Sequence, residues 1–324
     1  MDDVRWFASN AYTALVVSGL RDLGLRVSEE GDRPARVALA MSGLAAEHAW
    51  RYSRRHAARL VVYLWDLPPV GTGWGRPDPV WWAGGMFMRL PRPWGGYRRR
   101  RGYYSRLRYI VVRADGVWGP STLTCDTVAE RFGVRPARVP YCFDSTRFVP
   151  RPPTCRPVEP PTLLTVSRFR PHKNQAAVLD AAASLGPTVQ VRLIGRGEEQ
   201  RALEQRAVRL GVRCRIEPAA DDATVTRAYH EAAVAVCPSR FEGFGLTPIE
   251  AVASGVPVVA SDIPPHREFV GTAARLVPPD DVRALAAAIN KALDSAPADP
   301  ALVSDLTISA AAARFMAALR PFLG

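Results

Sequence analysis

The chain has 324 residues, 48% of them hydrophobic, which is enough for two domains that each bury a core. No apolar run reaches the roughly 18 to 20 residues that span a bilayer, and the acidic start lacks the basic region of a secretion signal, so we expect a cytoplasmic protein. Five widely spaced cysteines without a CxxC pair argue against a disulfide framework or a zinc site. The net charge of +12 is local, because residues 81–113 hold nine arginines and no acidic residue, and a local charge indicates a local partner.

Short apolar runs alternate with helical patterns in the first half of the chain. The runs lie at 4–8, 37–41, 60–64 and around residue 117, and the helical patterns lie at 12–23, 44–57 and 121–132. This alternation predicts an α/β domain. Between residues 67 and 108 the pattern is lost among Pro, Gly, Trp, Tyr and Arg, which predicts a loop.

Six prolines fall within residues 150–161. Proline fixes φ and lacks a backbone donor, so this segment fits neither a helix nor a central strand. We interpret it as a stiff linker between a first domain, 1–149, and a second domain, 162–303. The remaining residues, 304–324, predict a helix that could pack back on the first domain.

The second half alternates regularly between strands and helices. Strands are predicted at 162–167, 189–195, 214–218, 233–238, 256–261 and 274–277, with helices at 174–185, 198–210, 223–231, from about 247, and at 282–293. Right-handed crossovers then give a parallel sheet, which binds ligands beyond the carboxyl ends of its strands. The fold class is therefore α/β, with two Rossmann-like domains facing across a cleft.

Two loops that follow predicted strands carry cations or glycines. In VSRFRPHKN, Arg168 and Lys173 precede a helix N-terminus, a combination suited to a diphosphate, although a solvated basic loop is the simpler alternative. Lys173 favours the anion site, since the chain has only two lysines. In LIGRGEE, Gly195 belongs to a G-x-G turn, and the simplest interpretation is that these glycines only form the turn.

The stretch FEGFGLTPIE places Glu242 and Glu250 on either side of Gly243 and Gly245. The glycines allow a sharp turn and a close backbone approach to a ligand. Thr247, followed by Pro and then by Glu250 at the third helical position, is also the pattern of a capping box. Glu250 is accordingly a helix cap, a ligand contact or both, since a carboxylate has two oxygens. Glu242 is either an exposed loop acid or a contact to sugar hydroxyls.

Residues 238–270, PSRFEGFGLTPIEAVASGVPVVASDIPPHREFV, resemble the E-x7-E region of retaining GT-B glycosyltransferases of family 4. Residues 163–174 resemble the donor-phosphate loop of that family, and the resemblance runs from about 162 to 295. It implies a GT-B fold and the retaining transfer of a hexosyl unit from a UDP- or GDP-sugar to a hydroxyl of a glycan, a lipid-linked acceptor or a small molecule. A GT-B sugar-nucleotide epimerase, or an inactive nucleotide-sugar- or nucleic-acid-binding protein, is the alternative.

The resemblance also implies roles for single residues. Arg168 and Lys173 would neutralise the departing diphosphate, Glu242 would contact the donor sugar, and Glu250 the ribose. Backbone from Gly243 to Leu246 would cradle phosphate or sugar, and the loop at Glu217 and Pro218 would lie beside the base. No cofactor is implied, and no D-x-D motif is present to hold a metal ion. The implied donor-binding set is Arg168, Lys173, Gly195, Glu217, Pro218, Glu242, Gly243, Phe244, Gly245, Leu246, Thr247, Glu250, Ser9 and Asn10.

The first domain departs from the family pattern. Its first loop, FASNAYTA, lacks the usual glycines, so Ser9 and Asn10 are left as donors to phosphate. Asp66, in LWDLPP, either orients or deprotonates an acceptor hydroxyl or forms a turn before Pro68.

The stretch 81–113 mixes arginines with aromatic residues. It could dock on an anionic bilayer that carries a lipid-linked acceptor, stack on a sugar acceptor, bind nucleic acid or simply be solvated. We favour a membrane or an anionic acceptor over nucleic acid, and expect peripheral association with the inner face of the membrane. The residues assigned to this contact are Trp81, Trp82, Trp94, Arg98, Arg99, Arg100 and Arg101.

Overall fold

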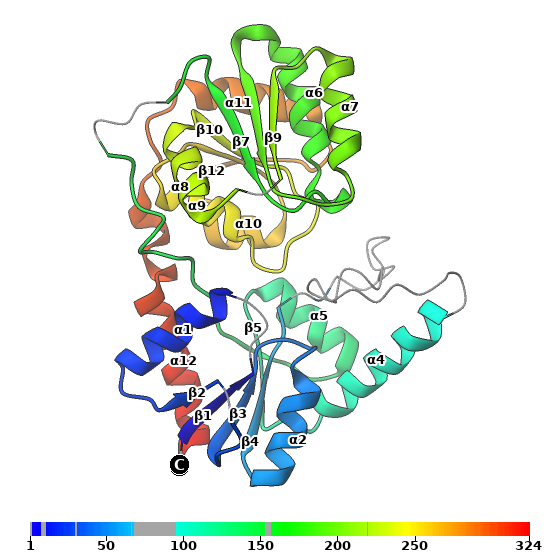
Figure 1. The fold of residues 1–324 in the computed structure, drawn as a ribbon, viewed down its shortest axis with the longest axis vertical. Helices are drawn as coiled ribbons and strands as arrows, with labels where there is room; N and C mark the ends of the chain where they lie inside the picture. Colours follow the sequence, from blue (N-terminus) through cyan, green and yellow to red (C-terminus); the bar gives the residue numbers. More distant parts are fainter. Residues whose placement is uncertain are drawn as a thin grey trace. The chain divides into compact units, whose positions relative to one another are not determined.

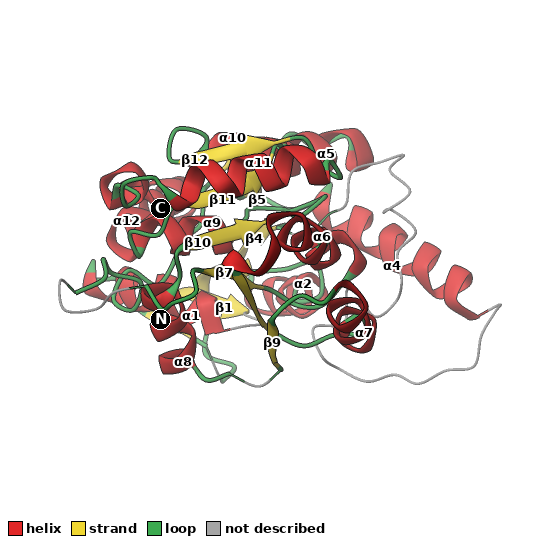
Figure 2. Ribbon diagram, turned by 90° about the horizontal axis from the view of Figure 1, so that it is seen from above, coloured by secondary structure: helices red, strands yellow, loops and turns green. Residues whose placement is uncertain are grey.

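The computed structural model describes residues 2–7, 11–29, 31–65, 67, 95–152, 157–218 and 220–324. Contacts divide the chain into two compact units (Figure 1). The first unit consists of Met1–Cys142 and Ile308–Gly324, and the second of Phe143–Thr307. Each unit contains a parallel six-stranded sheet with helices on both faces (Figure 2), which confirms the predicted α/β class.

The sheet of the first unit has the order β2-β1-β3-β4-β5-β6. Its strands are β1 (Asp2–Phe7), β2 (Val27–Ser28), β3 (Ala35–Ala40), β4 (Arg59–Tyr63), β5 (Gly116–Gly119) and β6 (Ala137–Arg138). Its helices are α1 (Ala11–Asp22), α2 (Ala46–His56), α4 (Gly95–Val111), α5 (Thr122–Phe132) and α12 (Ile308–Leu323).

The last helix, α12, packs against α1 and β3 of the first unit. A Cβ on Gly19 would lie 2.7 Å from Cβ of Ala312, so this glycine allows α1 and α12 to approach closely. Phe315 is fully buried, and its ring contacts those of Trp6, Tyr63 and Trp118. Among the described residues, only Pro300–Leu323 is apolar and long enough to cross a bilayer by composition, and here its α12 portion lines a protein core.

The predicted loop between residues 67 and 108 is wrong over its last part, because Gly95–Val111 forms α4. Leu107, Ile110 and Val111 recur at helical spacing and are buried against α2 and the sheet. The arginines at the other positions of α4 make the apolar spacing of these three residues hard to recognise in the sequence.

The second unit has the strand order β12-β11-β10-β7-β8-β9. Its strands are β7 (Thr162–Val166), β8 (Gln190–Ile194), β9 (Cys214–Glu217), β10 (Val234–Cys237), β11 (Val258–Ser261) and β12 (Ala274–Val277). Helices α6 (Gln175–Leu185), α7 (Gln200–Leu210) and α11 (Val282–Leu293) pack together on one face. Helices α8 (Asp222–Glu231), α9 (Leu246–Ala253) and α10 (Pro264–Val270) pack on the strands from the other side.

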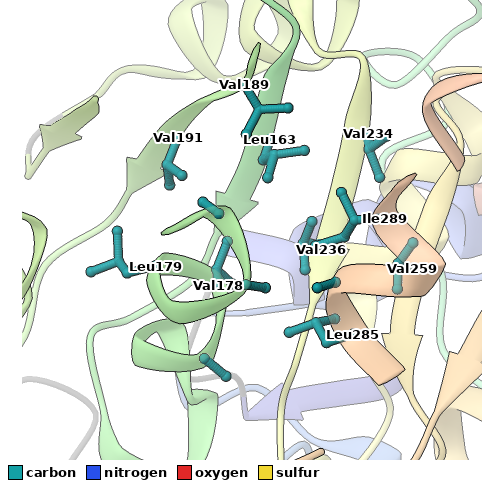
Figure 3. Close-up of a cluster of buried hydrophobic side chains, with 14 of the residues drawn as sticks. Leu163, Val178, Leu179, Val189, Val191, Val234, Val236, Val259, Leu285 and Ile289 are labelled. Atoms are coloured by element: carbon teal, nitrogen blue, oxygen red, sulfur yellow. The ribbon is translucent and has the colours of Figure 1, made fainter. Parts of the chain in front are cut away.

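An aliphatic core lies between the second sheet and α6 and α11 (Figure 3). Leu163, Val191, Val234 and Val259 from four adjacent strands meet Ile289 from α11 there, all nearly inaccessible to solvent. Truncating one such leucine or isoleucine to alanine costs about 2–5 kcal/mol in comparable cores. The strands are therefore anchored firmly, and their loops start from fixed points.

The boundary between the units lies at Cys142, seven residues before the expected end of the first domain. Residues 143–149 belong to the second unit because they pack on α8. Arg147 forms an ion pair of 2.6 Å with Asp222, and Phe148 packs its ring on Tyr229. Cys155 and its neighbours 153–156 lie outside the described residues.

Candidate functional site

The strand order of the second sheet reverses between β7 and β10. In open parallel sheets the connections leave in opposite directions at such a point, and ligands bind beyond the carboxyl ends of the two strands. The loop after β7 carries Arg168 and Lys173, and the loop after β10 carries Glu242. The topology thus brings three of the predicted residues to one edge.

The loop after β7 is held by close backbone packing on the turn after β8. Gly195 has φ 141°, and a Cβ there would lie 1.9 Å from the Ser167 carbonyl oxygen. A Cβ on Gly197 would lie 2.2 Å from the Phe169 carbonyl oxygen. The two glycines of the G-x-G pattern therefore permit one loop to lie directly on the other, which is more than forming a turn. Arg168 projects from this loop, exposed and without an ion pair among the described residues.

Lys173 ends the short 3-10 helix Pro171–Lys173 and reaches the loop after β10. Its Nζ lies 2.5 Å from Oε1 of Glu242, and both side chains are less than one-fifth exposed. Asn174, with φ 54°, turns the chain into α6 immediately afterwards. A cation and a carboxylate 69 positions apart in sequence thus form a largely buried pair at the reversal of the sheet.

The groups around Glu242 determine its protonation state. Burial alone would raise the pKa of Glu242, but Lys173 and its hydrogen bond hold that pKa below its ordinary value. Burial lowers the pKa of His172 to about 3 and also lowers that of His266, so both imidazoles are neutral near pH 7. Glu242 is therefore an ionised carboxylate that can only accept hydrogen bonds.

The turn between β10 and α9 differs from the predicted capping box. Gly245, with φ 88°, is the N-cap residue, and the helix begins at Leu246. Thr247 lies inside the helix and donates its hydroxyl to the Val166 carbonyl, at 3.0 Å, which ties the start of α9 to the end of β7. Gly243 and Phe244 are buried in the turn. The capping box is wrong because a left-handed glycine begins the helix and the threonine hydroxyl is engaged across the sheet.

Glu250 is 4% exposed, and Tyr229 donates to its Oε2 at 3.3 Å. Its carboxylate is thus buried and contacts α8 through Tyr229. Glu217 ends β9, and Arg192 binds it through two nitrogens at 2.7 and 3.2 Å. This hydrogen bonding lowers the pKa of Glu217 and commits its side chain to the fold. Its carbonyl accepts from Gly195 N at 3.0 Å, and Pro218 follows, exposed.

A second charged contact, which the sequence reasoning missed, fastens the two loops. Arg240 donates from Nε to Asp280 at 2.6 Å and from Nη1 to the Pro171 carbonyl at 2.6 Å. The Arg240 amide also donates to the His172 carbonyl, at 2.7 Å. The only sequence signal for this contact was that Arg240 and Asp280 both follow strands of the same sheet. His266, on α10, was also missed.

Several predicted residues are not placed by the structure. Ser9, Asn10, Asp66, Trp81, Trp82 and Trp94 lie outside the described residues. Arg98, Arg99, Arg100 and Arg101 lie in α4, but their side chains are not described. Among the described residues, no three His, Cys, Asp or Glu side chains are grouped so that they could hold a metal ion.

Comparison with known proteins bears on the second unit most directly. Residues 151–304 match the family described as Glycosyl transferases group 1. The chain is 39% identical over 140 residues to a phosphatidyl-myo-inositol mannosyltransferase of Mycolicibacterium smegmatis. This match covers 41% of this chain and 36% of the relative. It is 28% identical over 298 residues to the glycogen synthase of Mycobacterium tuberculosis. This match covers 84% of this chain and 66% of the relative.

The fold is similar to that of HepE from Anabaena, solved in complex with UDP. The TM-score is 0.67 at 17% identity, and the match covers 99% of this chain and 95% of HepE. At this identity the likeness concerns the fold, and it extends over both units.

Proposed function

We propose that the protein is a retaining, metal-independent glycosyltransferase, on the premise that residues 151–304 match the glycosyl transferases group 1 family within a chain that has the GT-B fold of two Rossmann-like domains. Its donor would be a UDP- or GDP-hexose, and its acceptor a hydroxyl of a glycan, of a lipid-linked sugar or of a small molecule. The observation that carries the proposal is the Lys173–Glu242 pair, 2.5 Å long, at the reversal of the second sheet.

The donor site follows from the side chains at this edge. Arg168 and Lys173 bind the diphosphate, together with the backbone N–H groups of Gly245 and Leu246 at the start of α9. Glu242 accepts hydrogen bonds from sugar hydroxyls, and Glu250 accepts one from the ribose. The ends of β8 and β9, at Gly195 and at Glu217 with Pro218, lie beside the base. Lys173 and Glu242 bind each other, so each of these two largely buried charges is compensated by the other.

The reaction needs charge stabilisation at the leaving group. The bond between the anomeric carbon and the diphosphate breaks, and negative charge grows on the departing phosphate oxygen. Arg168, Lys173 and the dipole of α9 stabilise that charge from fixed positions. The acceptor hydroxyl attacks the same face, and the departing phosphate takes its proton, so configuration is retained. Two cations supply the charge that a metal ion provides in other transferases.

The first unit carries a basic, aromatic surface suited to a membrane-bound acceptor. Trp50 of α2 and Tyr109 of α4 pack edge to face at 5.7 Å, Arg54 lies over Trp50, and Arg113 lies 3.9 Å from the centre of the Tyr109 ring. Arginine with exposed aromatic rings is the composition of surfaces that bind anionic lipid headgroups. We propose that this surface, with the arginines 98–101 of α4, holds the protein on the inner face of the membrane near a lipid-linked acceptor.

Thermal unfolding with UDP, GDP, ADP and their sugar conjugates tests the donor proposal. A ligand at a hundred times its dissociation constant stabilises by about 2.7 kcal/mol, which is seen as a clear rise in melting temperature. A rise with one diphosphate would identify the base. The absence of a rise with all of them would contradict the donor site and favour loss of the activity.

A further inference from the structure

His266 is almost fully enclosed, with 1% of its surface exposed. Its Nδ1 lies 2.9 Å from the Ser261 carbonyl oxygen, which can only accept, so Nδ1 carries the ring proton. The Ser261 hydroxyl donates to the Ser239 carbonyl and does not compete for Nδ1. In the neutral ring Nε2 then holds a lone pair, and it has no hydrogen-bond partner among the described residues.

The unpartnered Nε2 lies next to the turn that begins α9. A Cβ on Gly245 would lie 3.0 Å from Cδ2 and 3.4 Å from Nε2 of His266, so the ring edge lies directly against this glycine. Helix α10, which carries the ring, packs on α9, and the turn before α9 carries Glu242, so the ring lies beside the proposed donor site. A buried polar atom without a partner costs about 1–3 kcal/mol, so a protein retains one mainly where a ligand or water completes it.

We propose that Nε2 of His266 accepts a hydrogen bond from one hydroxyl of the donor sugar, so that His266 helps to determine which sugar is bound. The inference rests on the proposed function. A lone pair needs a donor, whereas a diphosphate at neutral pH offers only acceptors, so the complementary group is a hydroxyl. Glu242 is also only an acceptor, and the two side chains read two different hydroxyls around the Gly243–Gly245 turn.

The test compares His266→Asn with the wild type, using nucleotide sugars in which each hydroxyl in turn is replaced by fluorine. Fluorine keeps the size of the group but cannot donate. The asparagine amide keeps a donor near the Nδ1 position and lacks an acceptor at Nε2. Dissociation constants are measured by calorimetry for the parent sugar nucleotide, for each fluorinated analogue and for the free nucleoside diphosphate.

We expect one analogue to bind the wild type about 5- to 100-fold more weakly than the parent. In His266→Asn this analogue should bind as tightly as the parent sugar nucleotide does. The other analogues should lose the same affinity relative to the parent as they do in the wild type, and the free diphosphate should bind as in the wild type. His266→Gln, whose longer side chain carries an amide oxygen to the Nε2 position, should restore part of the penalty. It also provides the second variant if asparagine impairs folding.

An unchanged pattern of penalties in His266→Asn overturns the inference while the donor site stands, and means that a water molecule alone completes Nε2. Equal weakening of every ligand, the free diphosphate included, also overturns it, because the histidine then only supports the fold. Failure of the wild type to bind any sugar nucleotide would instead refute the proposed function.

Discussion

The two units share an architecture and differ in what their loops carry. Both are six-stranded parallel sheets, and in both the strand order reverses once, between β1 and β3 in the first and between β7 and β10 in the second. In the second unit the reversal holds Lys173 and Glu242 in contact. In the first unit the loop after β1 lies outside the described residues, and arginines pack on the aromatic rings of Trp50 and Tyr109 on the helices. The comparison teaches that a parallel sheet sets where a site can lie, and that the residues of the loops determine what such a site can bind.

The largest effect should come from Glu242→Gln. The amide keeps the shape of the carboxylate but weakens its interaction with the sugar and with Lys173. We expect transfer to fall about 10²- to 10³-fold, while the diphosphate binds within threefold of the wild type. Initial rates and calorimetry check both values. Full activity in the variant would show that Glu242, at the reversal between β7 and β10, takes no part in sugar transfer.

Gly195→Ala should destabilise the second unit strongly. The new Cβ would meet the Ser167 carbonyl at 1.9 Å, and the residue would keep a positive φ. We expect the free energy of unfolding to fall by about 3 kcal/mol or more. Gly211→Ala is the matched control, since φ is also positive there but no atom lies within 4 Å, and it should cost only about 1 kcal/mol. Equal costs in urea titrations would show that the loop after β7 is not held by this contact.

Reversing arginine charges tests whether the basic surface of the first unit, and not the exposed arginines of the second unit, binds the membrane. Arg54→Glu on α2 with Arg113→Glu after α4 should weaken binding to anionic vesicles about fivefold for each residue, and added salt should weaken the wild type as well. Arg201→Glu with Arg209→Glu, on exposed positions of α7, is the control in the second unit. Vesicle sedimentation measures both. If the two double variants bind alike, the basic surface of the first unit is not the membrane contact.

The smallest expected effect is a pH dependence of stability. Burial lowers the pKa of His172 to about 3, so between about pH 6.5 and 3 the unfolded chain binds a proton that the folded chain does not. This contribution is complete above pH 6.5 and is lost as the pH falls, by about 1 kcal/mol from pH 6.5 to 5.5. His266, whose pKa is also lowered, acts in the same direction. His172→Gln should therefore flatten the slope, and an unaltered slope in urea titrations at several pH values would contradict this origin.

The sequence was informative where local pattern and topology agree. Alternating apolar runs predict the six strands of the second sheet, four strands of the first (β1, β3, β4 and β5) and most of the helices, but not the two-residue strands β2 and β6. A parallel sheet also places the loops after β7 and β10 at one edge. The contact between Lys173 and Glu242 could not be predicted, because it depends on the order of the strands in the sheet. The periodicity of apolar residues predicts the strands but not their order. The stripe Leu107, Ile110 and Val111 of α4 was obscured by arginine, and the Thr247 capping pattern was overridden by a tertiary hydrogen bond to Val166.

His266 could not have been predicted from its neighbours in sequence. A histidine in a helical segment is usually an ordinary packed side chain, and its significance lies in an unpartnered Nε2 against Gly245. Such a feature depends on the contact of α10 with the start of α9, which only the assembled unit provides.

The measurement that tests the central claim most directly is diphosphate affinity in variants of the two lysines. Glu242→Gln serves as the reference, so that no carboxylate is left unpaired, and Lys173→Met or Lys291→Met is added to it. Removing a charged hydrogen bond to phosphate should weaken binding about 10- to 100-fold for Lys173→Met, and Lys291→Met, on α11, should change nothing. Equal affinities in the two double variants would contradict a donor site at the reversal between β7 and β10.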